Sequence, residues 1–571
     1  MAALFYLLGD HSSTAREFEI AELSDFDDLQ DLVASHFSIV EPHSECLALK
    51  SGTRNGLTYI FATLGVGLIS DNRHLTSVAD VLAADGPIAI SIDGSAVREI
   101  PGPKCLPYLG NYTQIYPDHL GNHQRLFDKY GGLFAVTSLG VKWHYTNDPN
   151  LANIFFTESE FFTKKVIPGH PLHPFNLENA GIFFGSTDSE NWRITHKFLP
   201  PALGPKAVKH YAPKMQLTVE DAFKVFDQLD ENEEAWNVFP YMLKLASQAI
   251  TKLILGMNVQ HFTSVDAPFD EMVIKIIELL ELTKKVSAYG TWYGNLPFGD
   301  PKKLRNHLSR VRALLDQSIK EAKKGEEDLE LQEAALQAEN VVDFCIRARD
   351  NKGNKMNEDQ VTLGLTAVTG AGFSTTAAML SWLIYGLVFY DGMQERLLQE
   401  LIDNDWDENT QVTPELTQKL TFLDKYVKET QRRHNSSFQP ARTAKTDMIL
   451  PGGYRMAKDS IVIIALHHIH TNSKHWDSPA RFDPDRWDTE EVKNRVAGSY
   501  QPFGSGARSC IGFNLALQEV KIFLPKLLYR YKFTLAKVGE TVEYDPNQVV
   551  IKPNNLYVRA ERRVRWPAKS E

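Results

Sequence analysis

The longest uninterrupted apolar segment constrains the fold most, because residues 361–390 run for 30 residues without a charged side chain. That length would let the segment cross a bilayer, which takes about 20 helical residues. The segment nevertheless contains seven Ser or Thr residues and four glycines, and it follows Asn357 and Glu358, which suit the N-terminus of a helix in water. A helix that is apolar all round can equally be the central helix of a large domain. We therefore predict a buried core helix and no transmembrane anchor.

Size and composition indicate globular domains. The chain has 571 residues, 43% of them hydrophobic and 23% charged, which exceeds one ordinary domain of about 100 to 200 residues and excludes wholesale disorder. The four cysteines are far apart and include no Cys-x-x-Cys pair, which argues against a disulfide framework or a cysteine-rich zinc site. We expect a soluble, cytoplasmic protein. The apolar run 57–69 leaves room for a peripheral membrane contact.

Charge is distributed unevenly along the chain. The net charge is −11, and residues 1–99 hold 15 Asp and Glu against 5 Lys and Arg, so this region alone contributes −10. A short basic tail, residues 559–571, ends the chain, and no long basic run exists to suggest nucleic-acid binding. We expect no nucleic-acid partner. The acidic region is expected to dock on a basic surface, or to serve as a solubility or folding aid, and both readings stay open.

Residues 1–95 have the pattern of a small α+β domain. Alternating polar and apolar residues indicate strands, and Ser24 with Asp27 three residues later indicates the start of an amphipathic helix. The expected strands are residues 2–8, 16–23, 46–50, 57–63 and 87–92. Two strands, a helix and further strands resemble a ubiquitin-like β-grasp module. A hinge rich in Pro and Gly, residues 96–111, follows this domain.

Residues 112–558 are predicted to form one large domain, mainly α-helical with small β-sheets. Long amphipathic patterns recur through it, and no internal repeat is visible. The clearest helical patterns are residues 208–229, 268–289 and 301–324. This second domain carries every motif with recognisable chemistry.

The most specific motif is the glycine-rich string FGSGARSCIG at residues 503–512, which stands just before a helical pattern. A metal-binding cysteine must be a thiolate, and thiolates are favoured beside cations, peptide N–H groups and helix N-termini. Glycines let N–H groups approach the sulfur of Cys510. Judged alone, Cys510 would more often be a small buried hydrophobic residue.

The whole string resembles the haem-binding loop of the cytochrome P450 family at every defining position, including Phe503 and Gly512. The resemblance implies the cytochrome P450 fold and a haem b cofactor. It makes Cys510 the axial iron ligand and Arg508 a partner of a haem propionate.

A second motif supports the resemblance. Glu429 and Arg432 lie three residues apart on a helix-like segment, so they share one face and can pair. Such a pair is usually a surface ion pair. In the family, a Glu-x-x-Arg pair joins an arginine of a later Pro-rich loop, and Arg486 in FDPDRW stands in the matching place. The resemblance therefore implies a structural triad.

Three further residues match family positions that contact haem propionates. Trp192 and His196 lie one helical turn apart, and their ring N–H groups are suitable donors, although such a pair usually serves packing. Arg442, in the string PARTA, matches another propionate partner. By resemblance, all three are cofactor-binding residues.

The uncharged segment contains AGFSTT at residues 371–376, which resembles the oxygen-binding segment of the family. There Gly372 would leave space beside the haem, and the Thr375 hydroxyl would hydrogen-bond dioxygen. The family usually has an acid before this threonine, where this chain has Ser374. Ser and Thr in buried helices also often bond to their own backbone carbonyls. The departure at Ser374 puts the usual proton route in doubt.

Together these motifs predict a monooxygenase that inserts one oxygen atom from dioxygen into a mostly apolar small molecule, either a lipid or a secondary metabolite. The resemblance places the substrate near residues 166–186, the middle of the uncharged segment, and residues 436–443. No flavin or nicotinamide domain fits in the rest of the chain, so a separate flavin or iron–sulfur protein is expected to donate electrons. Two alternatives stay open: an isomerase, ring-closing or oxidative-coupling enzyme, which Ser374 favours, and a haem-dependent interaction or regulatory protein.

Overall fold

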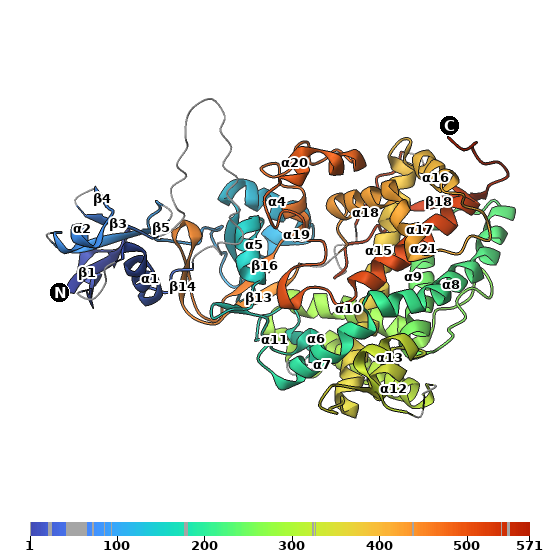
Figure 1. Cartoon of the computed structure of the whole chain (residues 1–571), viewed down its shortest axis with the longest axis horizontal. Coiled ribbons are helices and arrows are strands. Elements are labelled where there is room, and N and C mark those ends of the chain that lie inside the picture. Colours follow the sequence, from blue (N-terminus) through green and yellow to red (C-terminus); the bar gives the residue numbers. More distant parts are fainter. Residues whose placement is uncertain are drawn as a thin grey trace. The chain divides into compact units, whose positions relative to one another are not determined.

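The computed structural model describes most of the chain (Figure 1). The described residues are 2–20, 25–40, 66–70, 73–84, 86–92, 94–175, 181–322, 325, 327–436, 439–537, 539–544 and 549–570. They form two compact units. The first contains residues 1–114, 120–164 and 441–465, and the second contains residues 115–119, 165–440 and 466–571.

A five-stranded sheet forms the N-terminal part of the first unit, with strand order β2-β1-β5-β3-β4. Its strands are β1 (Ala2–Leu7), β2 (Arg16–Glu19), β3 (Val66–Ser70), β4 (Arg73–Leu75) and β5 (Ile88–Ile92). Strands β1 and β5 are parallel, and all other pairs are antiparallel. Helices α1 (Phe26–His36) and α2 (Val78–Leu82) pack against strands of the sheet.

The order of two strands, one helix and later strands agrees with the predicted α+β pattern, and the β-grasp assignment stays a prediction. The expected strands at residues 46–50 and 57–63, and the expected cap Ser24, lie outside the described residues. Asp25 caps α1 instead, because its carboxylate accepts a hydrogen bond from the Asp27 N–H at 3.0 Å.

Two more sheets complete the first unit. One has the order β7-β8-β16-β13-β9, and the other has the order β14-β15-β6. Their strands are β6 (Arg98–Glu99), β7 (Leu133–Ser138), β8 (Val141–Thr146), β9 (Phe162–Thr163), β13 (Ala441–Ala444), β14 (Met448–Leu450), β15 (Tyr454–Met456) and β16 (Ile461–Ile464). The connection from β13 to its antiparallel partner β16 runs through the β14–β15 hairpin.

The second unit is mainly helical. Its long helices are α7 (Glu190–Ala202), α8 (Pro205–Glu231), α9 (Val238–Ile250), α10 (Glu271–Ala288), α12 (Gly299–Glu321), α15 (Glu358–Phe389), α16 (Met393–Asp403), α18 (Thr421–Arg433) and α21 (Phe513–Arg530). Its short strands are β10 (Trp236–Asn237), β11 (Leu329–Glu330), β12 (Ala348–Arg349), β17 (Tyr531–Leu535) and β18 (Tyr557–Arg562). Helices α8, α10 and α12 confirm the three predicted amphipathic segments. The first residues of the predicted basic tail belong to β18.

The remaining helices are divided between the two units, and those within residues 120–164 belong to the first. They are α3 (Tyr112–Ile115), α4 (His119–Tyr130), α5 (Pro149–Phe156), α6 (Gly181–Phe184), α11 (Thr291–Gly294), α13 (Leu331–Gln337), α14 (Val341–Arg347), α17 (Pro414–Lys419), α19 (Leu466–His470) and α20 (Glu490–Lys493).

Helix α15 is the core helix of the second unit. Asn357 and Gln360 form a capping box at its start, as the polar residues there predict. The helix packs against α9, α18 and α21 (Figure 1). Most of its apolar side chains are buried, and Ala371 is exposed on the face that also bears Thr375. Among the described residues, α15 is the one helix long and apolar enough to cross a membrane, and 72% of its most apolar stretch is buried. Burial by protein explains why this segment carries no charge.

Candidate functional site

The glycine-rich loop folds back on itself immediately before α21. Gly504 and Gly506 have φ angles of 72° and 71°, in the left-handed region where a side chain is strained. The Cys510 N–H donates to the Phe503 carbonyl oxygen at 2.9 Å, which closes the loop. The ring of Phe503 lies 6.1 Å from that of Phe513, the first residue of α21. The glycines therefore let the chain place Cys510 beside a helix N-terminus.

The sulfur of Cys510 is accessible but poorly solvated. The residue is exposed, and desolvation by the protein atoms around it raises the pKa of its thiol. The Gly512 N–H acts in the opposite direction, because it hydrogen-bonds to sulfur. Protein groups alone therefore favour the thiol, and a coordinated cation would supply the charge that stabilises the thiolate. These properties suit a metal ligand better than a buried core residue.

Arg508 ties the loop to the segment around α6. Its terminal nitrogens donate to the carbonyl oxygens of Gly185 at 2.8 Å and of Ile182 and Phe183 at 3.2 Å each. Its guanidinium carbon lies 5.1 Å from the centre of the Trp192 ring. Arg508 thus fixes the position of the cysteine loop against α6 and α7.

Trp192 and His196 stack on α7, with ring centroids 4.4 Å apart and an interplanar angle of 23°. Burial and the positive charge of Arg508 lower the pKa of His196, whereas a hydrogen bond to the Ala507 carbonyl raises it. The indole Nε1 of Trp192 is buried and has no hydrogen-bond partner among the described residues. A buried N–H without an acceptor is costly, so this donor fits an additional ligand.

Arg442 lies on β13 in the first unit, with 2% of its surface exposed. Its Nε is 3.7 Å from Glu158, and its guanidinium lies 5.2 Å from the centre of the Phe156 ring. Burial lowers the pKa of Arg442 to about 10, and the charge of Glu158 opposes this. Nε and one terminal nitrogen lack hydrogen-bond partners among the described residues. Two unpartnered donors on a buried cation fit an anionic group such as a haem carboxylate.

The AGFSTT segment, residues 371–376, lies on α15, in the predicted helix. The Thr375 hydroxyl donates to the Ala371 carbonyl oxygen at 2.7 Å, which is the backbone bond common in buried helices. Ser374 is buried, and its hydroxyl has no partner among the described residues. At Gly372, a Cβ would lie 3.2 Å from the Ile250 Cδ1 of α9, so close helix packing also accounts for this glycine.

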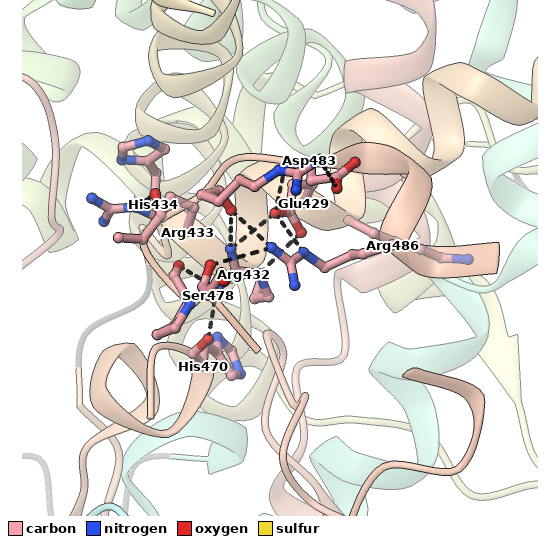
Figure 2. Close-up of polar contacts among 12 residues, drawn as sticks. Glu429, Arg432, Arg433, His434, His470, Ser478, Asp483 and Arg486 are labelled. Carbon is pink, nitrogen blue, oxygen red and sulfur yellow. Dashed lines mark hydrogen bonds and ion pairs between the residues drawn. The ribbon is translucent and has the colours of Figure 1, made fainter. Parts of the chain in front are cut away.

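The predicted triad forms a buried ionic cluster (Figure 2). The Glu429 carboxylate accepts two hydrogen bonds of 2.9 Å from Arg432 and one of 3.0 Å from Arg486. Glu429 and Arg432 are fully buried and Arg486 is 8% exposed, so this is no surface ion pair. The Asp483 N–H and the Trp487 indole also donate to Glu429.

Carbonyl oxygens satisfy the remaining guanidinium donors of the triad. Arg432 donates to the carbonyls of His470, Pro479 and Arg481, and Arg486 donates to those of Asp477 and Arg481 (Figure 2). A buried charge is tolerated when its hydrogen bonds are satisfied in this way. The cluster therefore fastens α18 to the segment from residue 470 to 487.

Sequence reasoning missed a buried carboxyl group, Glu519 on α21. The residue has no exposed surface, and burial raises the pKa of its carboxyl to about 8. The side chain of Thr376 on α15 lowers this pKa, an effect smaller than that of burial. Neither carboxyl oxygen has a well-formed hydrogen bond among the described residues. One signal was present, because Glu519 follows Leu515 by four residues and so continues an apolar helix face.

The first part of the predicted substrate region is apolar. Val166, Leu172, Phe175 and Phe184 share one cluster with Leu279 of α10. The rings of Phe175 and Phe184 lie 5.0 Å apart. Residues 176–180 and 437–438 of the predicted substrate segments lie outside the described residues.

Comparison with known proteins agrees with this geometry. The Cytochrome P450 family model matches residues 100–560. Cytochrome P450 monooxygenase alnD of Emericella nidulans is 41% identical over 571 residues, which covers 99% of each chain. The bifunctional cytochrome P450/NADPH–P450 reductase ascE of Acremonium egyptiacum is 26% identical over 481 residues, which covers 81% of this chain and 43% of that protein.

The crystal structure of the cytochrome P450DA heme domain superposes with a TM-score of 0.72 at 20% identity. The match covers 82% of this chain and 98% of the other, and it shows the fold. The family match and the relative aligned along nearly the whole length confirm the predicted fold and enzyme class. The chain belongs to the cytochrome P450 family of monooxygenases.

Proposed function

We propose that this protein is a haem-thiolate monooxygenase that inserts one oxygen atom from dioxygen into a mostly apolar small molecule, a lipid or a secondary metabolite. The observation that carries the proposal is Cys510, an accessible and poorly solvated sulfur in a glycine turn before α21. The apolar cluster around Phe175 and Phe184 supports an apolar substrate. When bound, a thiolate-ligated haem supplies dioxygen activation.

In this proposal, Cys510 holds the iron, and the unpartnered nitrogens of Trp192 and Arg442 receive haem carboxylates. By resemblance, His196 and Arg508 would be further partners of the haem carboxylates. Since carbonyls already occupy the terminal nitrogens of Arg508, its main contribution is to fix the loop that contains Phe503 and Gly512. The Glu429, Arg432 and Arg486 triad holds the segment before this loop.

Two hydroxyl groups of the proposed site lie on α15, those of Ser374 and Thr375. The Thr375 hydroxyl donates a hydrogen bond to the Ala371 carbonyl oxygen, so the lone pairs of the hydroxyl oxygen remain able to accept a hydrogen bond. The unpartnered Ser374 hydroxyl stands where the family usually has an acid. A hydroxyl can relay a proton but cannot store one as a carboxylic acid does, so we propose relay through Ser374 or water.

We propose electron supply from a separate flavin or iron–sulfur protein, with no flavin or nicotinamide bound by this chain. The relative whose name joins a P450 to an NADPH–P450 reductase supports a reductase as donor.

We also propose a soluble, cytoplasmic protein divided into an acidic domain (1–95), a hinge (96–111), a catalytic domain (112–558) and a basic tail (559–571). The buried state of α15 supports the absence of a transmembrane anchor.

Labelled dioxygen and a substrate panel test the proposal. Fatty acids, terpenoids and aromatic polyketides are screened for spectral shifts of the purified holoprotein, and those that bind are incubated with reductase and isotopically labelled dioxygen. We expect one labelled oxygen atom in the product. A product without label would support ring closure, isomerisation or coupling, which the hydroxyl of Ser374 favours as the second candidate. Spectral binding without any turnover would contradict both enzymatic candidates.

A further inference from the structure

The β14–β15 hairpin of the first unit lies between two segments of the N-terminal region. Along β14, the Val40 N–H donates to the Ile449 carbonyl oxygen at 2.8 Å, and the Ile449 N–H donates to the Ser38 carbonyl oxygen at 3.0 Å. Along β15, residues Tyr454 and Arg455 pair with β6 in parallel. Both outer edges of the hairpin are therefore hydrogen-bonded to residues that precede the catalytic domain, an arrangement that resembles strand addition to a sheet edge.

One hairpin side chain belongs to the core of the N-terminal domain. Ile449 is 4% exposed and lies in the same apolar cluster as Phe5, Leu29 and Val33. The N-terminal core is thus completed by a residue more than 400 positions further along the chain. Truncation of such a side chain leaves a cavity, so the contact contributes to the stability of both partners.

Polar contacts fix the position of the hairpin. One terminal nitrogen of Arg455 lies 2.5 Å and 2.6 Å from the two carboxylate oxygens of Asp10. Arg98 donates to the Gly452 carbonyl at 3.1 Å and to the Tyr454 hydroxyl at 2.9 Å. At Gly453, whose φ is 75°, a Cβ would lie 2.4 Å from the Ala96 carbonyl oxygen. One acidic residue of the N-terminal region, Asp10, therefore pairs with a basic side chain of the hairpin.

The hairpin connects the strand that bears Arg442 to its neighbour. It leaves β13 and returns in β16, and Arg442 pairs directly with Val462 of β16. We propose that the N-terminal domain is a built-in clamp for this hairpin, and that Ile449 and Arg455 are positioning residues that hold β13, and through it Arg442, for haem binding. This inference rests on the proposed role of Arg442 in the haem site.

The test uses full-length holoprotein with Ile449→Ala, Arg455→Ala and Arg455→Lys. Lys458→Ala is the matched control, because it removes an exposed cation three residues beyond Arg455. Amide hydrogen exchange is measured in the N-terminal strands and in β13 and β16, and haem loss is measured as transfer to apomyoglobin. We expect Ile449→Ala and Arg455→Ala to accelerate exchange in both regions and haem transfer several-fold. Arg455→Lys should restore part of the loss, and Lys458→Ala should match the wild type.

Two outcomes would overturn the clamp. Exchange that rises in the N-terminal strands alone, with haem transfer unchanged, would make the domain a passive attachment. Unchanged hydrogen exchange in both regions would show that the contact does not affect the local stability of β13. If Ile449→Ala does not fold, the two Arg455 variants still decide the question. Failure of the haem-thiolate function would appear separately, as a wild-type protein without haem, and the exchange measurement would remain informative.

Discussion

Replacement of Glu519 by Gln should change the pH dependence of stability. The carboxyl is fully buried on α21, and its oxygens have no well-formed hydrogen bonds among the described residues. Burial raises its pKa from 4.5 to about 8, so the folded protein strongly prefers the neutral acid. Gln has nearly the same shape and is neutral at every pH. The substitution therefore removes the titration with little change in packing volume.

The size of the effect follows from the two pKa values. Below about pH 4.5 the acid is neutral in both states, and its contribution to stability is fully present. As the pH rises toward 8, the unfolded chain ionises while the folded one does not, and stability is lost. Each pKa unit corresponds to about 1.4 kcal/mol, so the loss reaches roughly 5 kcal/mol at high pH and about 3 kcal/mol between pH 5.5 and 8.5.

Urea unfolding of the holoprotein, followed by tryptophan fluorescence at pH 5.5, 7.0 and 8.5, measures this difference. The free energy of unfolding of Glu519→Gln minus that of the wild type should rise with pH by about 3 kcal/mol over this range. Glu491→Gln, an exposed substitution on α20, controls for general charge effects. Its free energy of unfolding should follow the same pH dependence as that of the wild type. Parallel pH profiles for Glu519→Gln and the wild type would refute the claim that this carboxyl is buried and neutral.

Two further substitutions test other parts of the site. Glu429→Gln leaves two buried guanidinium groups facing one neutral amide, so we expect a loss of about 3–5 kcal/mol in unfolding free energy, measured by urea titration; a loss below about 1 kcal/mol would contradict a buried ionic cluster. Trp192→Phe keeps a smaller aromatic ring but removes the unpartnered indole Nε1. Haem transfer to apomyoglobin should then be a few-fold faster at unchanged secondary structure, and an unchanged rate would exclude Nε1 as a donor to haem.

Residue spacing was sufficient to predict the parts of the site that are local in sequence. Glu429 and Arg432 share a helix face because they are three residues apart, and the glycines of the 503–512 loop specify left-handed turns before a helix. The lack of charge in residues 361–390 correctly predicted the core helix, because most of its side chains are buried by protein and few face water.

Features that depend on distant packing could not be predicted. The spacing of Glu519 from Leu515 only hints at a buried helix face, and the burial itself depends on the packing of α15 against α21. Ile449 joins the N-terminal core across more than 400 residues of sequence, and no periodicity signals such a contact. The sequence motif predicts that Gly372 leaves space beside a haem. The structure adds a second reason for a glycine here, the close approach of Ile250. In each case the decisive neighbour lies on another element.

The bond between Cys510 and iron is tested most directly by the spectrum of the reduced, carbon monoxide-bound protein after Cys510→Ser. Cys105→Ser is the control, because Cys105 is also an exposed free cysteine but lies far from the loop in sequence. The wild type and Cys105→Ser should show the red-shifted Soret band of a thiolate-ligated haem, and Cys510→Ser should lose it. Retention of that band in Cys510→Ser would contradict the assignment of this sulfur as the iron ligand.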